Sequence, residues 1–214
     1  KYDLYQLNVL ESNAKCIKTK EVNHIRTTLC VHSSSIDYTS YKISTEGIKE
    51  EELVSSFLEV LNKTKNCLAI DIGTHVGLFT LFAAKLGKQV ISVEPFHDNI
   101  IRLQKGAELE NIRDKIVLLK YAVSKKKNEK VLLSPHKNIA DKLFNRLDIK
   151  MVFMEWDNLR KKTDLIKEIN EMIDFLVERN YVPFDPIKNR RLNLSEWKNK
   201  WGIDVVWKKT NKIS

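Results

Sequence analysis

The chain has 214 residues, of which 43% are hydrophobic and 30% charged, an ordinary balance for a globular domain with a full core. No apolar run approaches the roughly 18 residues that a membrane helix requires. The net charge of +9 fits either a lysine-rich composition or a polyanionic partner. A nucleic acid is not favoured, because the one dense basic run, SKKKNEK at 124–130, is not interleaved with aromatic residues. Since the sequence begins with Lys1 rather than methionine, we expect it to be a trimmed part of a protein that has lost a signal or anchor.

Strands and helices alternate through the first half of the chain. Residues 1–46 lack a clean period and are expected to form an N-terminal extension that packs on the domain, with TTLCVHS and 37–44 as short strands or an edge hairpin. The hydrophobic pattern then predicts, in order, a helix at 48–64, a buried strand at 67–73, a helix at 77–87, a strand at 89–95, a helix at 97–111 and a strand at 115–124. This alternation indicates an α/β fold with a doubly wound parallel sheet.

The second half predicts further strands and a long amphipathic helix. The expected elements are a strand at 130–135, a short helix at 140–148, a strand at 149–156, a helix at 163–180 and strands at 181–184 and 203–209. Thr163 is the expected N-cap of the long helix, and Asn180 suits a left-handed residue at its end. The last two strands are expected to close the sheet as an antiparallel pair.

One stretch, residues 68–95, carries the pattern of a ligand site. Asp71 ends the first strand, Gly73 and Gly77 open the following turn, and Glu94 ends the second strand. The G-x-x-x-x-G-K-[ST] phosphate loop is absent, and the turn lacks the close second glycine of the dinucleotide pattern G-x-G-x-x-G. S-adenosylmethionine suits this pattern, because it carries an ammonium group and a ribose but no phosphate. Asp71 can hold its amino-acid end, and Glu94 can accept its ribose hydroxyls.

The segments DIGTHVGLFTL, VISVEP, NIIRLQKGAELENI and IVLLKYAVS resemble the FkbM-type methyltransferase family. The flanks are similar to animal members, in which a G-x-x-E pattern, here Gly47 and Glu50, helps to cover the methyl donor. The resemblance implies a Rossmann-like, doubly wound seven-stranded methyltransferase sheet over 47–214, mostly parallel with an antiparallel C-terminal strand. It also implies S-adenosylmethionine as cofactor, S-adenosylhomocysteine as product, and O-methyl transfer to a sugar or polyketide hydroxyl. The implied cofactor-binding residues are Glu50, Asp71, Gly73, Thr74, His75, Gly77, Glu94, Pro95, Phe96 and Ala122.

The sequence departs from this family between 124 and 148. Family members have a fourth strand resembling K-x-D-x-E-G there, and this chain has no such acidic strand. A missing central strand would leave the sheet open, so we expect the printed sequence to join two parts of a longer chain near 138–139. Candidate bases for the acceptor are His75, His97, His136 and Glu155. Glu155, at the end of the strand at 149–156, is the favoured catalytic residue, and an ion pair is its alternative role.

The sequence leaves several alternatives open for the cysteine pairing, the compartment and the class of function. Cys16 and Cys30 could pair, and Cys67 is expected to be a free, buried thiol. With the animal-type flanks, a pair would favour the secretory pathway, and within it the Golgi lumen, with the cytoplasm as the alternative. Besides a glycan O-methyltransferase, an N-methyltransferase acting on protein or nucleic acid and a binding module without catalysis are considered. The chain lacks an [DNS]-P-P-[YFW] loop. Metal use and oligomeric state are not readable, although a divalent metal is compatible with the sequence.

Overall fold

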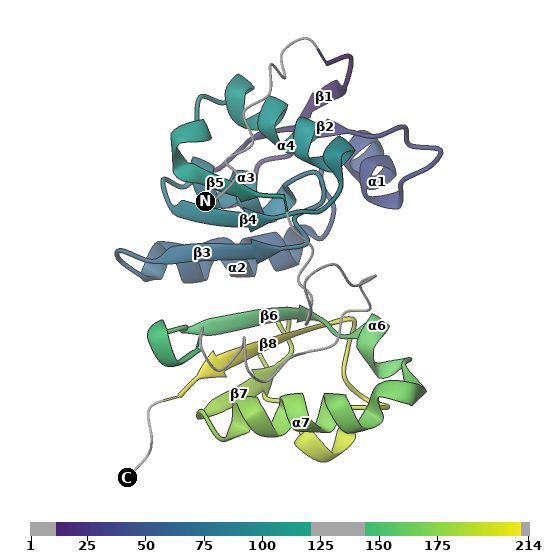
Figure 1. Cartoon of the computed structure of the whole chain (residues 1–214), viewed down its shortest axis with the longest axis vertical. Coiled ribbons are helices and arrows are strands. Elements are labelled where there is room, and N and C mark those ends of the chain that lie inside the picture. The colour runs from purple at the N-terminus through teal and green to yellow at the C-terminus, as the bar shows by residue number, and fades with distance from the viewer. Residues whose placement is uncertain (1–11, 121–143, 211–214) are drawn as a thin grey trace. The chain divides into compact units, whose positions relative to one another are not determined.

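The structure is a computed structural model that describes residues 12–120 and 144–210 (Figure 1). The chain divides into two compact units, residues 1–123 and 124–214, and each is described by itself. Within these described ranges, no helix is both long and apolar enough to cross a membrane.

The first unit contains the predicted parallel sheet. Its strands are β3 (Leu68–Ile72), β4 (Gln89–Val93) and β5 (Ile116–Leu119), in the order β3-β4-β5. All pairings are parallel, and Asp71 lies opposite Ser92. The expected alternation is therefore confirmed in this half, and the carboxyl ends of β3 and β4 meet at one edge of the sheet.

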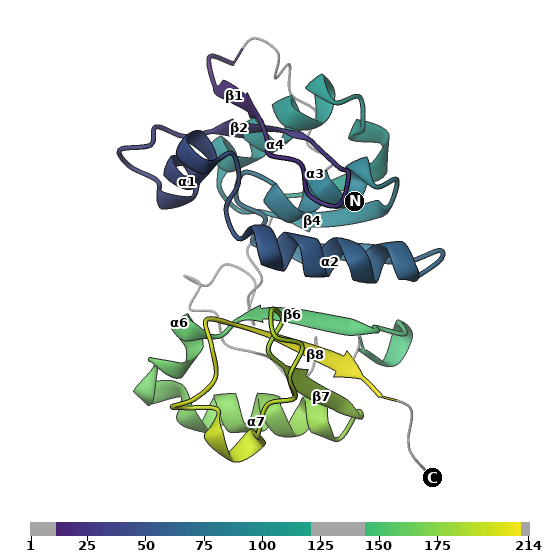
Figure 2. The ribbon, with the colours of Figure 1, turned by 180° about the vertical axis from the view of Figure 1, so that it is seen from behind.

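Three helices accompany this sheet, as the hydrophobic pattern predicts. They are α2 (Glu51–Lys63), α3 (Leu78–Lys85) and α4 (His97–Leu109), with the short 3-10 turn η2 (Arg113–Lys115) before β5. Six of the eight residues of α3 are buried, so its nearly all-apolar sequence reflects a position inside the unit. Helix α2 lies behind β3 in Figure 1 and is seen from its other side in Figure 2, and its buried residues Val54, Leu58 and Leu61 share one core cluster with Ala69 of β3.

The N-terminal region corrects one prediction. Strands β1 (Lys15–Lys18) and β2 (Thr28–Val31) form an antiparallel pair, in which Cys16 lies opposite Cys30 and is joined to it by a disulfide. The segment 37–44, expected as a short strand or part of an edge hairpin, forms instead the N-cap and most of helix α1 (Tyr38–Glu46). The helix forms because the Asp37 side chain accepts a hydrogen bond from the Ser40 backbone N–H, and Gly47 ends it in the left-handed conformation.

The second unit has an antiparallel sheet. Strands β6 (Met151–Glu155), β7 (Tyr181–Phe184) and β8 (Asp204–Lys209) are ordered β6-β8-β7, which confirms the expected antiparallel end of the fold. The other elements are α6 (Asp157–Arg160), η3 (Thr163–Leu165), α7 (Ile166–Val177) and η4 (Leu194–Glu196). The buried core is built around Trp156, Trp201 and Trp207.

The predicted ends of the long helix have different outcomes. Thr163 is not its N-cap, because Thr163 begins the 3-10 turn η3 and Leu165 occupies the cap position without a side-chain hydrogen bond. Asn180 does adopt the left-handed conformation, with φ of 64°. The left-handed conformation of Asn180 is therefore confirmed, but the helix itself begins at Ile166 and ends at Val177, with Glu178 as its C-cap, so it is shorter than predicted at both ends.

Several predictions fall outside the described residues. These are the strand at 130–135, the junction near 138–139, Ala122 and His136. Of the helix expected at 140–148, residues 144–146 are helical. The described strands form the antiparallel pair β1-β2, a parallel set of three and an antiparallel set of three, so a single sheet of seven strands stays a prediction.

Candidate active site

The candidate site forms where β3 and β4 end side by side. The turn after β3 is tied to the end of β4, because the Gly73 backbone N–H donates to the Val93 carbonyl oxygen at 2.8 Å. Gly73, His75 and Gly77 all have positive φ, at 78°, 53° and 90°. The turn thus curls tightly and brings its backbone next to the residue that follows β4.

Glu94 is the buried centre of this arrangement, with 3% of its surface exposed. One carboxylate oxygen accepts from the His75 backbone N–H at 2.9 Å. The other accepts from the Phe96 backbone N–H at 3.0 Å and from Asn99 Nδ2 at 3.1 Å. A carboxylate offers about four acceptor positions, so roughly one remains for a ligand hydroxyl. Glu94 therefore both holds the turn and can still accept a hydrogen bond.

Asp71 supplies the second carboxylate of the site. It accepts a hydrogen bond from Thr80 Oγ1 at 2.6 Å, and that hydroxyl also contacts Ser92 Oγ at 2.7 Å. Burial raises the pKa of Asp71, and the nearby charge of Glu94 raises it further. A positively charged group bound beside Asp71 would lower that pKa again, so the position favours a cationic ligand group.

The two glycines of the turn have different roles. A side chain added at Gly77 would lie 2.8 Å from Leu103 Cγ, so Gly77 allows α3 and α4 to pack closely. A side chain added at Gly73 would meet no atom within 4 Å, so its backbone is open to a ligand. Between them Thr74 is buried, and its Oγ1 has no hydrogen-bond partner among the described residues. An unpartnered buried hydroxyl in an open turn is suited to bind a polar ligand atom.

Two residues that were not predicted from the sequence contact His75, and a third contacts one of these two. His75 Nε2 lies 3.4 Å from Asp37 Oδ1, and its ring stacks on His32 with centroids 5.6 Å apart. His32 Nε2 in turn lies 2.6 Å from Asn99 Oδ1. Burial lowers the pKa of the His75 imidazole, and the charge of Asp37 opposes that shift. The neutral imidazole is thereby favoured, with a carboxylate beside one nitrogen. No local sequence signal reports His32 or Asn99, because only the fold brings them to this turn.

The other predicted cofactor-binding residues directly follow Glu94, precede α2 or lie outside the described part of the chain. Phe96 is 69% exposed at the start of α4, and Pro95 before it is half-buried. Glu50 precedes α2 in a left-handed conformation and is ion-paired with Lys49, whose charge acts on the pKa of His75. Ala122 is not among the described residues.

Glu155, the favoured catalytic residue, belongs to the second unit, whereas the groups described above belong to the first. Glu155 ends β6 in the second unit, exposed and opposite Asp204 in the antiparallel register. Across the described ranges, no group of three or more His, Cys, Asp or Glu side chains is arranged to hold a metal ion. His97, another candidate base, is the exposed first residue of α4.

No family model and no curated protein matches the chain. Among solved structures, it is similar to the C-terminal domain of precorrin-6Y C5,15-methyltransferase from Rhodobacter capsulatus, with 13% identity, a TM-score of 0.48, and coverage of 76% of this chain and 90% of that one. It is also similar to a human methyltransferase 10 domain containing protein, with 15% identity, a TM-score of 0.42, and coverage of 81% and 93%. A third is the N-terminal domain of human METTL16 in complex with SAH, with 15% identity, a TM-score of 0.36, and coverage of 74% and 68%. At these TM-scores the likeness assigns no function to the chain.

Proposed function

We propose that the chain is an S-adenosylmethionine-dependent methyltransferase. The observation that carries this proposal is the meeting of Asp71, the open turn at Gly73 and the buried Glu94 at one edge of the parallel sheet. The ammonium group of the donor suits Asp71, and a ribose hydroxyl suits the remaining acceptor position of Glu94. The unpartnered Thr74 hydroxyl offers one further polar contact.

Phosphate-bearing ligands suit this site less well. The turn from Gly73 to Gly77 contains no Lys or Arg, and the two nearest acids, Asp71 and Glu94, would repel a phosphate. A nucleoside ligand that has no phosphate and carries a positive charge is therefore the better fit. This reasoning favours S-adenosylmethionine over a dinucleotide on chemical grounds.

We further propose a hydroxyl acceptor, most specifically a sugar or glycan hydroxyl. The resemblance to the FkbM-type family supports this choice. The bound donor supplies an already activated methyl group, so the protein has to align the acceptor and receive the hydroxyl proton. His75 is suited to that proton transfer, because burial favours its neutral form and Asp37 can stabilise the charged form. Glu155 remains our proposed acceptor contact.

The compartment that we propose is the secretory pathway. The disulfide between Cys16 and Cys30 supports this proposal, because structural disulfides persist in oxidising compartments. Alkylation of the native protein under non-reducing conditions, read by mass spectrometry, should label only Cys67. Labelling of all three cysteines would instead favour the cytoplasm.

Two measurements test the function. Calorimetry should detect binding of S-adenosylmethionine and S-adenosylhomocysteine but not of NAD, and Asp71→Ala should weaken that binding about tenfold, the value of one charge-assisted hydrogen bond. Labelled methyl transfer is then screened against glycans, peptides and RNA. Donor binding together with methyl transfer only to a peptide or to RNA would show that the acceptor belongs to that class and is not a glycan. Failure of both donor and product to bind would refute the methyltransferase itself.

A further inference from the structure

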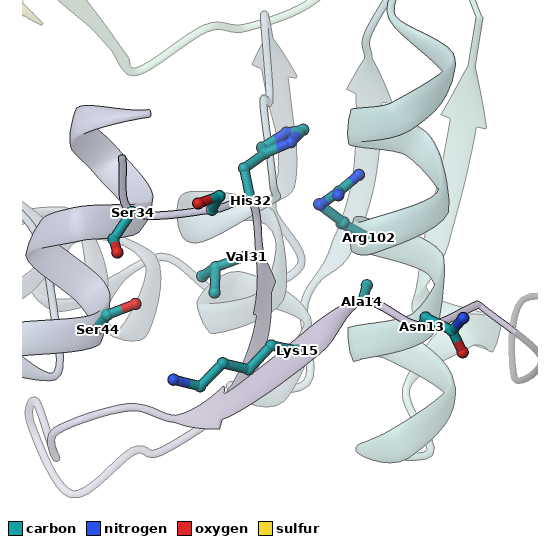
Figure 3. A pocket seen from close by; sticks show the side chains of 9 residues that line it. Asn13, Ala14, Lys15, Val31, His32, Ser34, Ser44 and Arg102 are labelled. Carbon is teal, nitrogen blue, oxygen red and sulfur yellow. The ribbon is translucent and has the colours of Figure 1, made fainter. Parts of the chain in front are cut away.

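A pocket of about 360 Å³ lies in the first unit between the β1-β2 pair, α1 and α4 (Figure 3). Its volume is near the lower end of the roughly 300–1,000 Å³ of small-molecule sites. The lining side chains come from all four elements and from the loop after β2. Those that matter for binding are Lys15, His32, Ser34, Ser44 and Arg102.

The charge of this pocket is positive. Lys15 and Arg102 line it, and none of its lining residues is Asp or Glu. Arg102 Nη1 donates to the backbone oxygen of Asp98 at 2.8 Å, so no carboxylate is used there. Its Nε is buried and has no hydrogen-bond partner among the described residues. The guanidinium therefore keeps donor capacity that a bound anion could use.

A neighbouring lysine strengthens this positive character. Lys105 lies three residues after Arg102 on α4, and its ammonium donates to the Ala14 carbonyl oxygen at 3.1 Å. Ala14 is itself part of the pocket wall. The Lys105 ammonium adds positive charge near the pocket while fixing the start of β1. Close packing of α4 on β2 shapes the same region, since a side chain at Gly106 would lie 2.7 Å from the Thr28 carbonyl oxygen.

The pocket adjoins the candidate active site through one residue. His32 lines the pocket and also stacks on His75 of the turn after β3. It contacts Asn99, which donates to the buried Glu94. A ligand held against His32 would thus lie next to the residues that we assign to the donor and to proton transfer.

We propose that this pocket binds the anionic group of a sugar acceptor, that is, a carboxylate, sulfate or phosphate carried on the sugar. That the bound sugar is a methyl acceptor rests on the proposed methyltransferase function. The binding of an anionic sugar to this pocket does not depend on that function. Arg102 supplies the charge-assisted hydrogen bonds that such groups require, and Lys15, whose side chain points away from Arg102 in Figure 3, adds positive charge from another part of the lining. The hydroxyls of Ser34 and Ser44 lie where neutral sugar hydroxyls could be bound.

The test uses the full chain without donor and four probes: glucuronate, glucose 6-sulfate, glucose 6-phosphate and neutral glucose. Calorimetry should show binding of at least one anionic probe that is about tenfold tighter than that of glucose, and the NMR signals of the His32 ring should shift on titration. Arg102→Gln should weaken binding of the anionic probe about tenfold, and Lys15→Gln should weaken it by a smaller factor, because Lys15 contributes charge without sharing the hydrogen bonds of Arg102. Arg113→Gln is the matched control, because Arg113 pairs with Glu108 outside the pocket.

The outcomes separate this inference from the proposed function. Equal binding of glucose and all anionic probes, or anion binding that survives both pocket variants, would overturn it. Lys15 is exposed, so Lys15→Gln remains informative if Arg102→Gln does not fold. Anion binding without S-adenosylmethionine binding would leave the pocket in place and remove the methyltransferase. Donor binding without any preference for anions would remove the proposed pocket ligand and leave the methyltransferase function in place.

Discussion

Glu94 joins two turns that belong to different strands of the sheet. Its carboxylate receives hydrogen bonds from His75, Phe96 and Asn99, and it is the acid that we assign to the donor ribose. A purely ligand-binding residue could be removed without harm to the fold. Glu94 cannot, because its loss leaves these donors unpaired in a buried place.

We therefore expect Glu94→Ala to lower both stability and donor affinity. The loss of stability should be about 2 kcal/mol or more, since buried donors are left without acceptors. Glu94→Gln should lose less stability, because the amide oxygen still accepts hydrogen bonds from one side. Urea unfolding and donor calorimetry on both variants check this order. Unchanged stability in Glu94→Ala would contradict the structural role.

Removing the charge of Asp71 is expected to leave the stability of the ligand-free protein unchanged or raised, in contrast to the loss of Glu94. The pKa of Asp71 is raised by burial and by Glu94, so ionisation of Asp71 destabilises the ligand-free fold as the pH rises above its ordinary value of 3.8. Asp71→Asn can still accept from Thr80 and removes that buried charge. At neutral pH we expect a ligand-free melting temperature equal to or above that of the unchanged protein, together with about tenfold weaker donor binding. A lower melting temperature with full donor affinity would contradict the assignment.

At the scale of elements, the packing of α3 on α4 depends on Gly77. An alanine there would need a left-handed backbone and would place a carbon 2.8 Å from Leu103 Cγ. Gly77→Ala should therefore cost about 3 kcal/mol, the sum of backbone strain and overpacking. Gly73→Ala is the control, because it has similar strain but open space, and should cost about 1 kcal/mol. Chemical denaturation of both variants measures the difference, and equal losses would show that packing at Leu103 is not limiting.

Four elements of the first unit are connected by Glu110, the buried residue that follows α4. Burial alone would raise its pKa, but hydrogen bonds from Lys18 on β1, Lys85 on α3 and Thr28 on β2 lower the pKa to about 2. The ionised carboxylate therefore contributes stability that is fully present above the ordinary pKa of 4.5 and is lost as the pH falls towards about 2.

Glu110→Gln should accordingly destabilise the protein by about 2 kcal/mol at neutral pH. The variant should also show a flatter loss of stability on acidification between 4.5 and about 2. Thermal unfolding across that range checks both effects. Asp114→Asn is the control, because Asp114 pairs with Lys115 on the exposed surface. Parallel acid curves for Glu110→Gln and the unchanged protein would contradict this account.

The elements that the sequence predicts well are those with a complete hydrophobic pattern. Helix α3 and strands β3 and β4 are predicted because their apolar runs end at glycine or at a carboxylate. Helix α1 is missed because its aromatic and β-branched residues are typical of a strand, although only Ser40 and Ile43 are buried, three positions apart. The Asp37 cap and the terminal Gly47 are the signals that indicate the helix.

The site is predictable only in its local part. The turn residues and Glu94 follow from one contiguous stretch, because strand, turn and strand are neighbours in sequence and in space. His32 and Asn99 are 67 positions apart and meet only after β2 has packed on α4. A single sequence carries no periodicity that reports such a contact. The acceptor side depends on long-range contacts of the same kind, so the role of Glu155 stays a prediction.

For the whole molecule, the division into two units makes a prediction about where the donor acts. All the described residues that we assign to donor binding lie in the first unit. In hydrogen exchange, S-adenosylmethionine should slow the amides of the turn 73–77 and of residues 94–99 most strongly, since binding stabilises the elements that it contacts. Asp71→Asn at the same donor concentration serves as control. Equal slowing throughout 144–210 would contradict donor binding by the first unit alone.

The aromatic core of the second unit has an optical consequence. Every tryptophan of the chain, Trp156, Trp197, Trp201 and Trp207, belongs to that unit, and the indole rings of Trp156 and Trp201 lie 4.7 Å apart. Intrinsic indole emission is therefore a reporter of the second unit, while far-ultraviolet circular dichroism reports on the backbone of both. Unfolding curves from the two signals should separate whenever a substitution weakens only the first unit, so the native chain carries its own unlabelled probe for telling which half has melted.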